Sequence, residues 1–120
     1  MTIVIDAPAK ARGFFLAAFK EYEKRLSRRF KFEFGENGDY SVVLSPKGEP
    51  LSSEELAQRI DEIEIKSRHL RISTWPTERE GFDEAWLLSS CDLGPDCQVA
   101  AIMEQIYRAT KISRNEPYHK

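Results

Sequence analysis

The sequence of 120 residues has only two cysteines and two histidines, and it lacks a long apolar segment. Two cysteines cannot form the disulfide framework on which many small secreted domains depend. Cys91 and Cys97 also lack the close spacing and the second ligand pair of a zinc knuckle. Residues 14–19 are apolar, but a membrane span needs about 20 such residues. The sequence therefore predicts a cytoplasmic protein without a structural disulfide, a metal site or a membrane contact.

Catalytic and nucleotide-binding motifs are missing as well. The sequence contains no P-loop, no dinucleotide-binding fingerprint and no nucleophile elbow, and no motif places it in a known family. Only His69 with Cys91 or Cys97 offers a base and a nucleophile for a small enzyme, and nothing in the sequence fixes their geometry. We therefore expect a protein that is not an enzyme and that needs no cofactor.

The composition is that of an ordinary globular domain, with 41% hydrophobic and 32% charged residues. Its length fits a single domain, which we expect to span residues 1–112 and to be followed by a frayed tail at 113–120. The net charge of -2 gives no general attraction to nucleic acid.

Residues 30–45 carry the strongest secondary-structure signal. Apolar and polar residues alternate on both sides of Asn37-Gly38, a pattern typical of two strands joined by a hairpin. A three-residue turn ending at Gly38, with a positive φ, would place all large apolar side chains on one face. In that register Phe32 lies opposite Val42. We expect an antiparallel hairpin that the rest of the chain must cover.

The remaining elements follow from caps and periodicity. We expect a strand at 2–5, a helix from Asp6 to about Arg29, a helix opened by a Ser52–Glu55 capping box, and a last helix at 96–111. Residues 69–74 indicate a third strand or a continued helix, and residues 82–89 indicate a helix after a second capping box. Together these elements predict an α+β fold, in which a small antiparallel sheet carries three to four helices mainly on one face.

Two charged sets are candidate binding sites. The basic set lies at the end of the first helix and contains Lys24, Arg25, Arg28, Arg29 and Lys31. These cations suit phosphates, although the dipole of a helix C-terminus also favours them. The acidic set lies on the helix after Ser52 and contains Glu54, Asp61 and Glu62. It suits a basic partner protein, although a solvated helix face has the same appearance.

By elimination, the sequence predicts a non-catalytic module that binds another protein, such as an inhibitor, an immunity-type protein or an adaptor. The acidic set would then contact a basic surface of that partner, and homodimer formation is compatible with the same charges. The first alternative is a nucleic-acid-binding protein that uses the basic set. The second alternative is the small enzyme that uses His69 and a cysteine.

Overall fold

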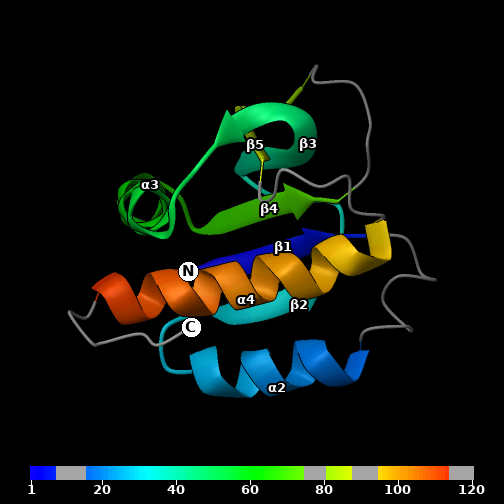
Figure 1. The fold of residues 1–120 in the computed structure, drawn as a ribbon, viewed down its shortest axis with the longest axis vertical. Coiled ribbons are helices and arrows are strands. Elements are labelled where there is room, and N and C mark those ends of the chain that lie inside the picture. The colour runs from blue at the N-terminus through cyan, green and yellow to red at the C-terminus, as the bar shows by residue number, and fades with distance from the viewer. Residues whose placement is uncertain (8–15, 75–80, 88–94, 114–120) are drawn as a thin grey trace.

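The computed structural model describes residues 1–7, 16–74, 81–87 and 95–113. These ranges contain five strands and three helices, whose arrangement can be followed in Figure 1. In chain order they are β1 (Thr2–Asp6), α2 (Leu16–Leu26), β2 (Lys31–Phe34), β3 (Tyr40–Pro50), α3 (Ser53–Lys66), β4 (His69–Ser73), β5 (Glu84–Leu87) and α4 (Pro95–Ser113).

The five strands form one sheet in the order β2-β1-β4-β3-β5, and every described pair is parallel. The predicted antiparallel hairpin is therefore wrong, and the fold is α/β rather than α+β. Phe32 lies beside Ile3 of β1, while Val42 lies beside Ile72 of β4. Two other strands separate β2 from β3, because each finds its partner in a distant part of the chain.

Residues 35–39 connect β2 to β3 and cross both intervening strands. Parallel strands usually need a connection of a dozen or more residues, most often with a helix. Here the chain lies directly on the sheet. At the two ends of the connection, the Gly35 amide donates to the Ile5 carbonyl at 3.2 Å and the Asp39 amide donates to the His69 carbonyl at 3.0 Å. Between these ends, Gly38 lies against Arg71 of β4.

Gly38 is required by this close approach and not by a turn. A Cβ atom at Gly38 would lie 2.7 Å from the Cβ of Arg71 and 2.9 Å from its amide nitrogen. Among the described glycines only Gly81 has a positive φ, of 85°, so the predicted left-handed conformation of Gly38 is also wrong. Asn37-Gly38 resembles a hairpin signal because both situations need a residue without a side chain.

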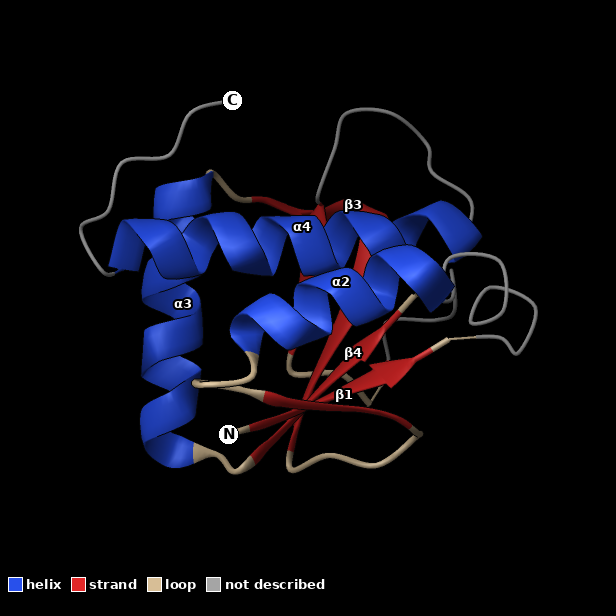
Figure 2. Ribbon diagram, turned by 90° about the horizontal axis from the view of Figure 1, so that it is seen from below, coloured by secondary structure: helices blue, strands red, loops and turns tan. Residues whose placement is uncertain are grey.

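The helices lie on one face of the sheet, as Figure 2 shows. The units β1–α2–β2 and β3–α3–β4 advance in the same direction along the sheet, so right-handed crossovers place both helices on the same side. The connection from β2 to β3 runs back in the other direction and lies on the opposite face, against Arg71. The main core fills the helix-covered side and includes Ile3, Ile5, Leu70 and Ile72.

The helix expected at residues 82–89 is a strand in the described part, since β5 pairs with β3. The Trp86 side chain of β5 is fully buried, and Gly48 of β3 packs against the backbone of Trp86. The pattern around Trp86 had the right spacing for a helix, but the tertiary pairing with β3 decides the structure. The second capping box, at Thr77 and Glu80, lies outside the described residues.

Several local predictions are confirmed. The Ser52–Glu55 capping box opens α3, with the Glu55 amide donating to Ser52 Oγ at 3.1 Å and the Ser52 amide donating to Glu55 Oε1 at 3.0 Å. The last helix forms as expected. Residues 69–73, for which the sequence left a strand or a continued helix open, are a strand. In the described residues, no helix is both long and apolar enough to cross a membrane.

Candidate functional site

The carboxyl ends of β1 and β4 form the point where the chain changes direction across the sheet. These two strands are neighbours, but the chain leaves β1 towards β2 and leaves β4 towards β5. In open parallel sheets, ligands bind outside the carboxyl ends of the strands at such a point. We call this region the carboxyl edge. It comprises Asp6, the last residue of β1, with Ala7, and Ser73, the last residue of β4, with Thr74.

The polar groups of the carboxyl edge are paired with one another. Arg71 donates to Asp6 Oδ2 from Nε at 3.0 Å and from Nη2 at 2.7 Å. The Thr74 amide donates to the Asp6 carbonyl at 3.0 Å, and the side chains of Ser73 and Thr74 are buried. The Arg71 guanidinium also lies 4.9 Å from the centre of the Phe82 ring. Through these contacts, the two charged side chains described at this edge, Asp6 and Arg71, are each other's partners.

The opposite end of the strands carries a pocket with a volume of about 510 Å³. We call it the amino-edge pocket, because β1, β2 and β4 all begin there. Its lining combines cationic and hydroxyl side chains, and it consists of Met1, Thr2, Ser27, Arg28, Arg29, Phe30, Lys31, Glu64, Ser67, Arg68 and His69.

Arg29 is the fixed part of the amino-edge pocket. Its guanidinium donates to Asp61 at 2.5 Å and to Glu64 at 3.0 Å, and it lies 4.7 Å from the centre of the Phe30 ring. Burial opposes its charge, but the hydrogen bonds and the two carboxylates outweigh burial and raise the pKa of Arg29. Arg29 therefore ties the end of α2 to α3 and shapes the wall of the pocket.

Three other cations of the pocket remain available. Arg28, Lys31 and Arg68 are exposed, and within the part of the chain that the structure describes none of them makes an ion pair. The structure thus brings part of the predicted basic set together with Arg68, which the sequence analysis did not name, and with His69, which it named only as a candidate catalytic base. Their position beside Lys31 follows from β2 and β4 both being parallel neighbours of β1, which the predicted hairpin concealed.

The other two residues of the basic set lie on the surface of α2. Lys24 is exposed, and Arg25 pairs with Glu21 at 3.0 Å. The Arg25 guanidinium also lies 5.8 Å from the ring centre of Tyr22 and 5.6 Å from that of Tyr107 in α4. Arg25 therefore lies on the surface of the protein and also contributes to the packing of α2 against α4.

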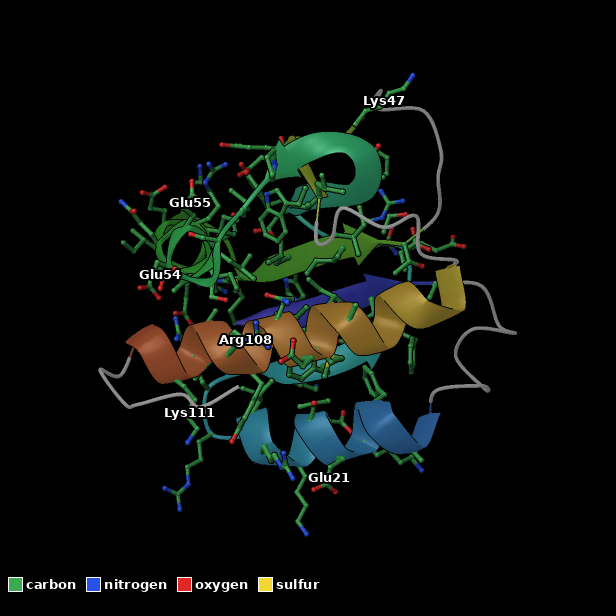
Figure 3. The ribbon with its side chains drawn as sticks, in the orientation of Figure 1. Glu21, Lys47, Glu54, Glu55, Arg108 and Lys111 are labelled. Atoms are coloured by element: carbon green, nitrogen blue, oxygen red, sulfur yellow. The ribbon has the colours of Figure 1, made fainter. Side chains whose placement is uncertain are left out.

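The acidic set does not form a separate surface. Glu54 and Glu62 are exposed on α3, and Figure 3 shows Glu54 beside α3. Asp61, by contrast, is bound to Arg29 at 2.5 Å. The acidic and basic sets meet at this ion pair, so Asp61 has a structural partner within its own chain.

The structure separates His69 from the second cysteine. His69 begins β4 at the amino edge, whereas α4 begins near the carboxyl ends of the strands, with Cys97 in its first turn (Figure 1). Cys91 lies outside the described residues. The described part of the chain contains no group of three or more side chains suited to hold a metal ion.

These features define the class of protein: an α/β protein with a parallel sheet and a ligand-type edge at a reversal of strand order. The family model described as "Predicted SPOUT methyltransferase" matches residues 34–119. This match covers most of the chain, and the protein therefore belongs to the SPOUT methyltransferase family.

The similarity to individual relatives extends over nearly the whole chain. Ribosomal RNA large subunit methyltransferase H 1 of Thermoanaerobacter sp. (strain X514) is 32% identical over 92% of this chain and 92% of its own length. The methyltransferase H of Dictyoglomus thermophilum is 31% identical over 88% of this chain and 76% of its own. That of Thermotoga maritima is 28% identical over 99% of both.

The family corrects the function expected from the sequence. Its relatives are named as methyltransferases, so the hypothesis of a non-catalytic inhibitor, immunity-type or adaptor protein is wrong, and so is the expectation that the chain is not an enzyme. We expected no enzyme because the P-loop, the dinucleotide-binding fingerprint and the nucleophile elbow are absent. These motifs belong to other enzyme families, so their absence does not exclude a methyltransferase of this family. The alignment with the T. maritima relative extends over 150 positions, so that relative carries residues that this 120-residue chain lacks.

Proposed function

We propose that this chain transfers a methyl group to ribosomal RNA of the large subunit. The observation that carries the proposal is the extent of the similarity: a relative with this name matches 92% of the chain at 32% identity. That span includes most of the parallel sheet with its reversal of strand order. A binding module that shared only one element with an enzyme would not match over its full length.

The charges of the described surface support a nucleic-acid substrate. The backbone of a nucleic acid presents phosphate oxygens, which guanidinium and ammonium groups bind. The amino-edge pocket presents Arg28, Lys31 and Arg68 without carboxylate partners. The acidic set gives less support to a protein partner, because Asp61 is bound to Arg29.

A methyltransferase also needs a methyl donor, and the carboxyl edge is where the strand order favours such a ligand. The described polar groups of that edge are engaged with one another, so they could line a donor site but are not left over to bind the donor. Asp6 is neutralised by Arg71, and its carbonyl already accepts from the Thr74 amide. We therefore assign no described side chain to the donor.

A direct assay tests the proposal. The purified chain is incubated with S-adenosylmethionine labelled in its methyl group and with isolated large and small ribosomal subunits. The Thermoanaerobacter relative is assayed in parallel as the positive control. We expect label in RNA of the large subunit and none in RNA of the small subunit. If the relative labels the large subunit and this chain labels neither, the proposed function is wrong.

A further inference from the structure

We infer that the amino-edge pocket is an anchor for the phosphates of RNA, remote from the edge where the methyl donor is expected. The inference rests on the proposed function for the identity of the nucleic acid. The two edges are separated by the length of β1, which has five residues and is therefore about 17 Å long. A single RNA segment can contact both edges across that distance.

The charge balance of the pocket favours an anion. Four of its lining side chains are guanidinium or ammonium groups, and only Glu64 is a carboxylate. Glu64 is already engaged, since it accepts from Arg29 at 3.0 Å. Arg28, Lys31 and Arg68 remain, and they come from two separate parts of the chain: the stretch from the end of α2 to the start of β2, and the link between α3 and β4. Cations that converge from separate segments fit a phosphate chain better than a single helix end.

The helix dipoles account for only part of this charge. Both α2 and α3 end at the pocket, and each helix C-terminus carries about half a negative charge. Two such termini together offset roughly one positive charge. The three unpaired cations Arg28, Lys31 and Arg68 therefore keep an excess of positive charge. Lys31 belongs to β2 and lies beyond the end of α2, so the dipole does not explain its position.

The pocket also offers hydrogen-bond donors that suit phosphate oxygens. Thr2 and Ser67 place hydroxyl groups in its lining, whereas the Ser27 hydroxyl already donates to the Lys24 carbonyl at 3.0 Å. Hydroxyls and arginines are the usual phosphate contacts in protein–nucleic acid complexes. The volume of about 510 Å³ falls within the usual range for ligand sites. Because Arg29 is held by Asp61 and Glu64, the wall behind the free cations is already in place before a ligand binds.

The test uses the double variant Arg28→Ala/Arg68→Ala and a protein-free transcript of large-subunit rRNA. Both side chains are exposed and unpaired in the described structure, so the variant should fold normally. The dissociation constant is measured as a function of salt concentration. We expect weaker binding and a salt dependence whose logarithmic slope falls by about 1 for each lost phosphate contact, thus by about 2 in all.

The matched control is Lys20→Ala/Lys47→Ala, which removes the same charge from exposed positions outside the pocket; Figure 3 shows Lys47 projecting away from the helices. It should change the slope much less.

If both double variants lower the slope equally, the pocket is not the anchor, even if methyl transfer is intact. If the pocket variant binds free rRNA normally but no longer binds the whole large subunit, the site contacts a ribosomal protein and the inference is wrong. If the unaltered chain neither binds nor methylates rRNA, the proposed function fails together with the inference.

Discussion

The two edges of the sheet treat their charged groups in opposite ways. At the carboxyl edge, Asp6 and Arg71 are bound to each other, with 11% and 24% of their side chains exposed. At the amino edge, Arg28 and Arg68 are exposed and have no ion-pair partner among the described residues. Paired, largely buried charges fix the architecture, whereas exposed unpaired charges contribute little to stability and remain available for a ligand. The paired charges of the carboxyl edge therefore stabilise the fold, and we assign the unpaired charges of the amino edge to RNA.

The largest effect is expected in the connection that joins the two edges. Gly38→Ala should lower the free energy of unfolding by about 3 kcal/mol or more, because the new Cβ would meet backbone and Cβ atoms of Arg71 at 2.7–2.9 Å. Chemical denaturation measures the loss. Gly81→Ala is the control: Gly81 has φ 85° but open space around it, so only the backbone cost of about 1–2 kcal/mol applies. Equal losses would show that residues 35–39 do not lie against β4.

The next effect concerns the ion pair of the carboxyl edge. Asp6→Ala should cost about 2 kcal/mol, less than for a fully buried pair, because Arg71 keeps part of its contact with solvent. Adding Arg71→Met should recover part of this loss, since the unpaired charge is then gone. A double variant that is less stable than Asp6→Ala alone would mean that Arg71 stabilises the fold through Phe82 and not through Asp6.

A smaller effect, which depends on pH, is expected at Glu84 on β5. Burial alone would raise its pKa, but hydrogen bonds from Tyr40 and Trp86 and the charge of Arg59 outweigh burial and hold the pKa of Glu84 below its ordinary value of 4.5. Ionised Glu84 therefore stabilises the fold fully above pH 4.5, and this contribution is lost as the pH falls through the folded-state pKa.

Glu84→Gln should cost about 1 kcal/mol at neutral pH, since a neutral amide accepts these hydrogen bonds less strongly. The variant should also lose less stability than the unaltered protein between pH 5 and the acid transition, roughly the range in which such carboxylates titrate. Thermal unfolding followed at several pH values measures both. Parallel pH curves for the two proteins would exclude Glu84 as a source of the acid sensitivity.

The smallest effect on stability is expected at the amino edge. Reversing Arg28 and Arg68 to glutamate should change the free energy of unfolding by less than about 0.5 kcal/mol, because neither side chain has a partner to lose among the described residues. The same measurement on Arg29→Ala should show a larger loss, since Asp61 and Glu64 would lose their shared cation. If the reversal destabilises the protein as much as Arg29→Ala does, the division between the two edges is wrong.

Local signals in the sequence predicted single elements well. The Ser52–Glu55 capping box needs only residues three apart, and α3 begins where it was expected. Strand pairing depends instead on residues far apart in the chain. Asn37-Gly38 favoured a hairpin, and nothing local shows that Gly38 lies against β4. The alternation of strand and helix in β1–α2–β2 and β3–α3–β4 was the available signal for parallel pairing, since such units form parallel sheets.

The candidate site was predicted in part for the same reason. Arg28, Arg29 and Lys31 are close in sequence and were found together, and they line one pocket. Arg68 and His69 join them only because β1 lies between β2 and β4 in a parallel sheet. The carboxyl edge was missed entirely, because Asp6 and Arg71 are 65 residues apart and neither belongs to a motif. Asp6 was interpreted as a helix cap, while its side chain binds Arg71.

We propose that this chain methylates RNA of the large ribosomal subunit, and such a reaction would change the mass of that RNA. Large-subunit RNA is incubated with the purified chain and S-adenosylmethionine, digested with a ribonuclease, and analysed by mass spectrometry. We predict that one fragment gains the mass of a single methyl group, and that the gain is absent when the protein or the donor is omitted. An unchanged set of fragments, under conditions in which the Thermoanaerobacter relative modifies the same RNA, would contradict the account.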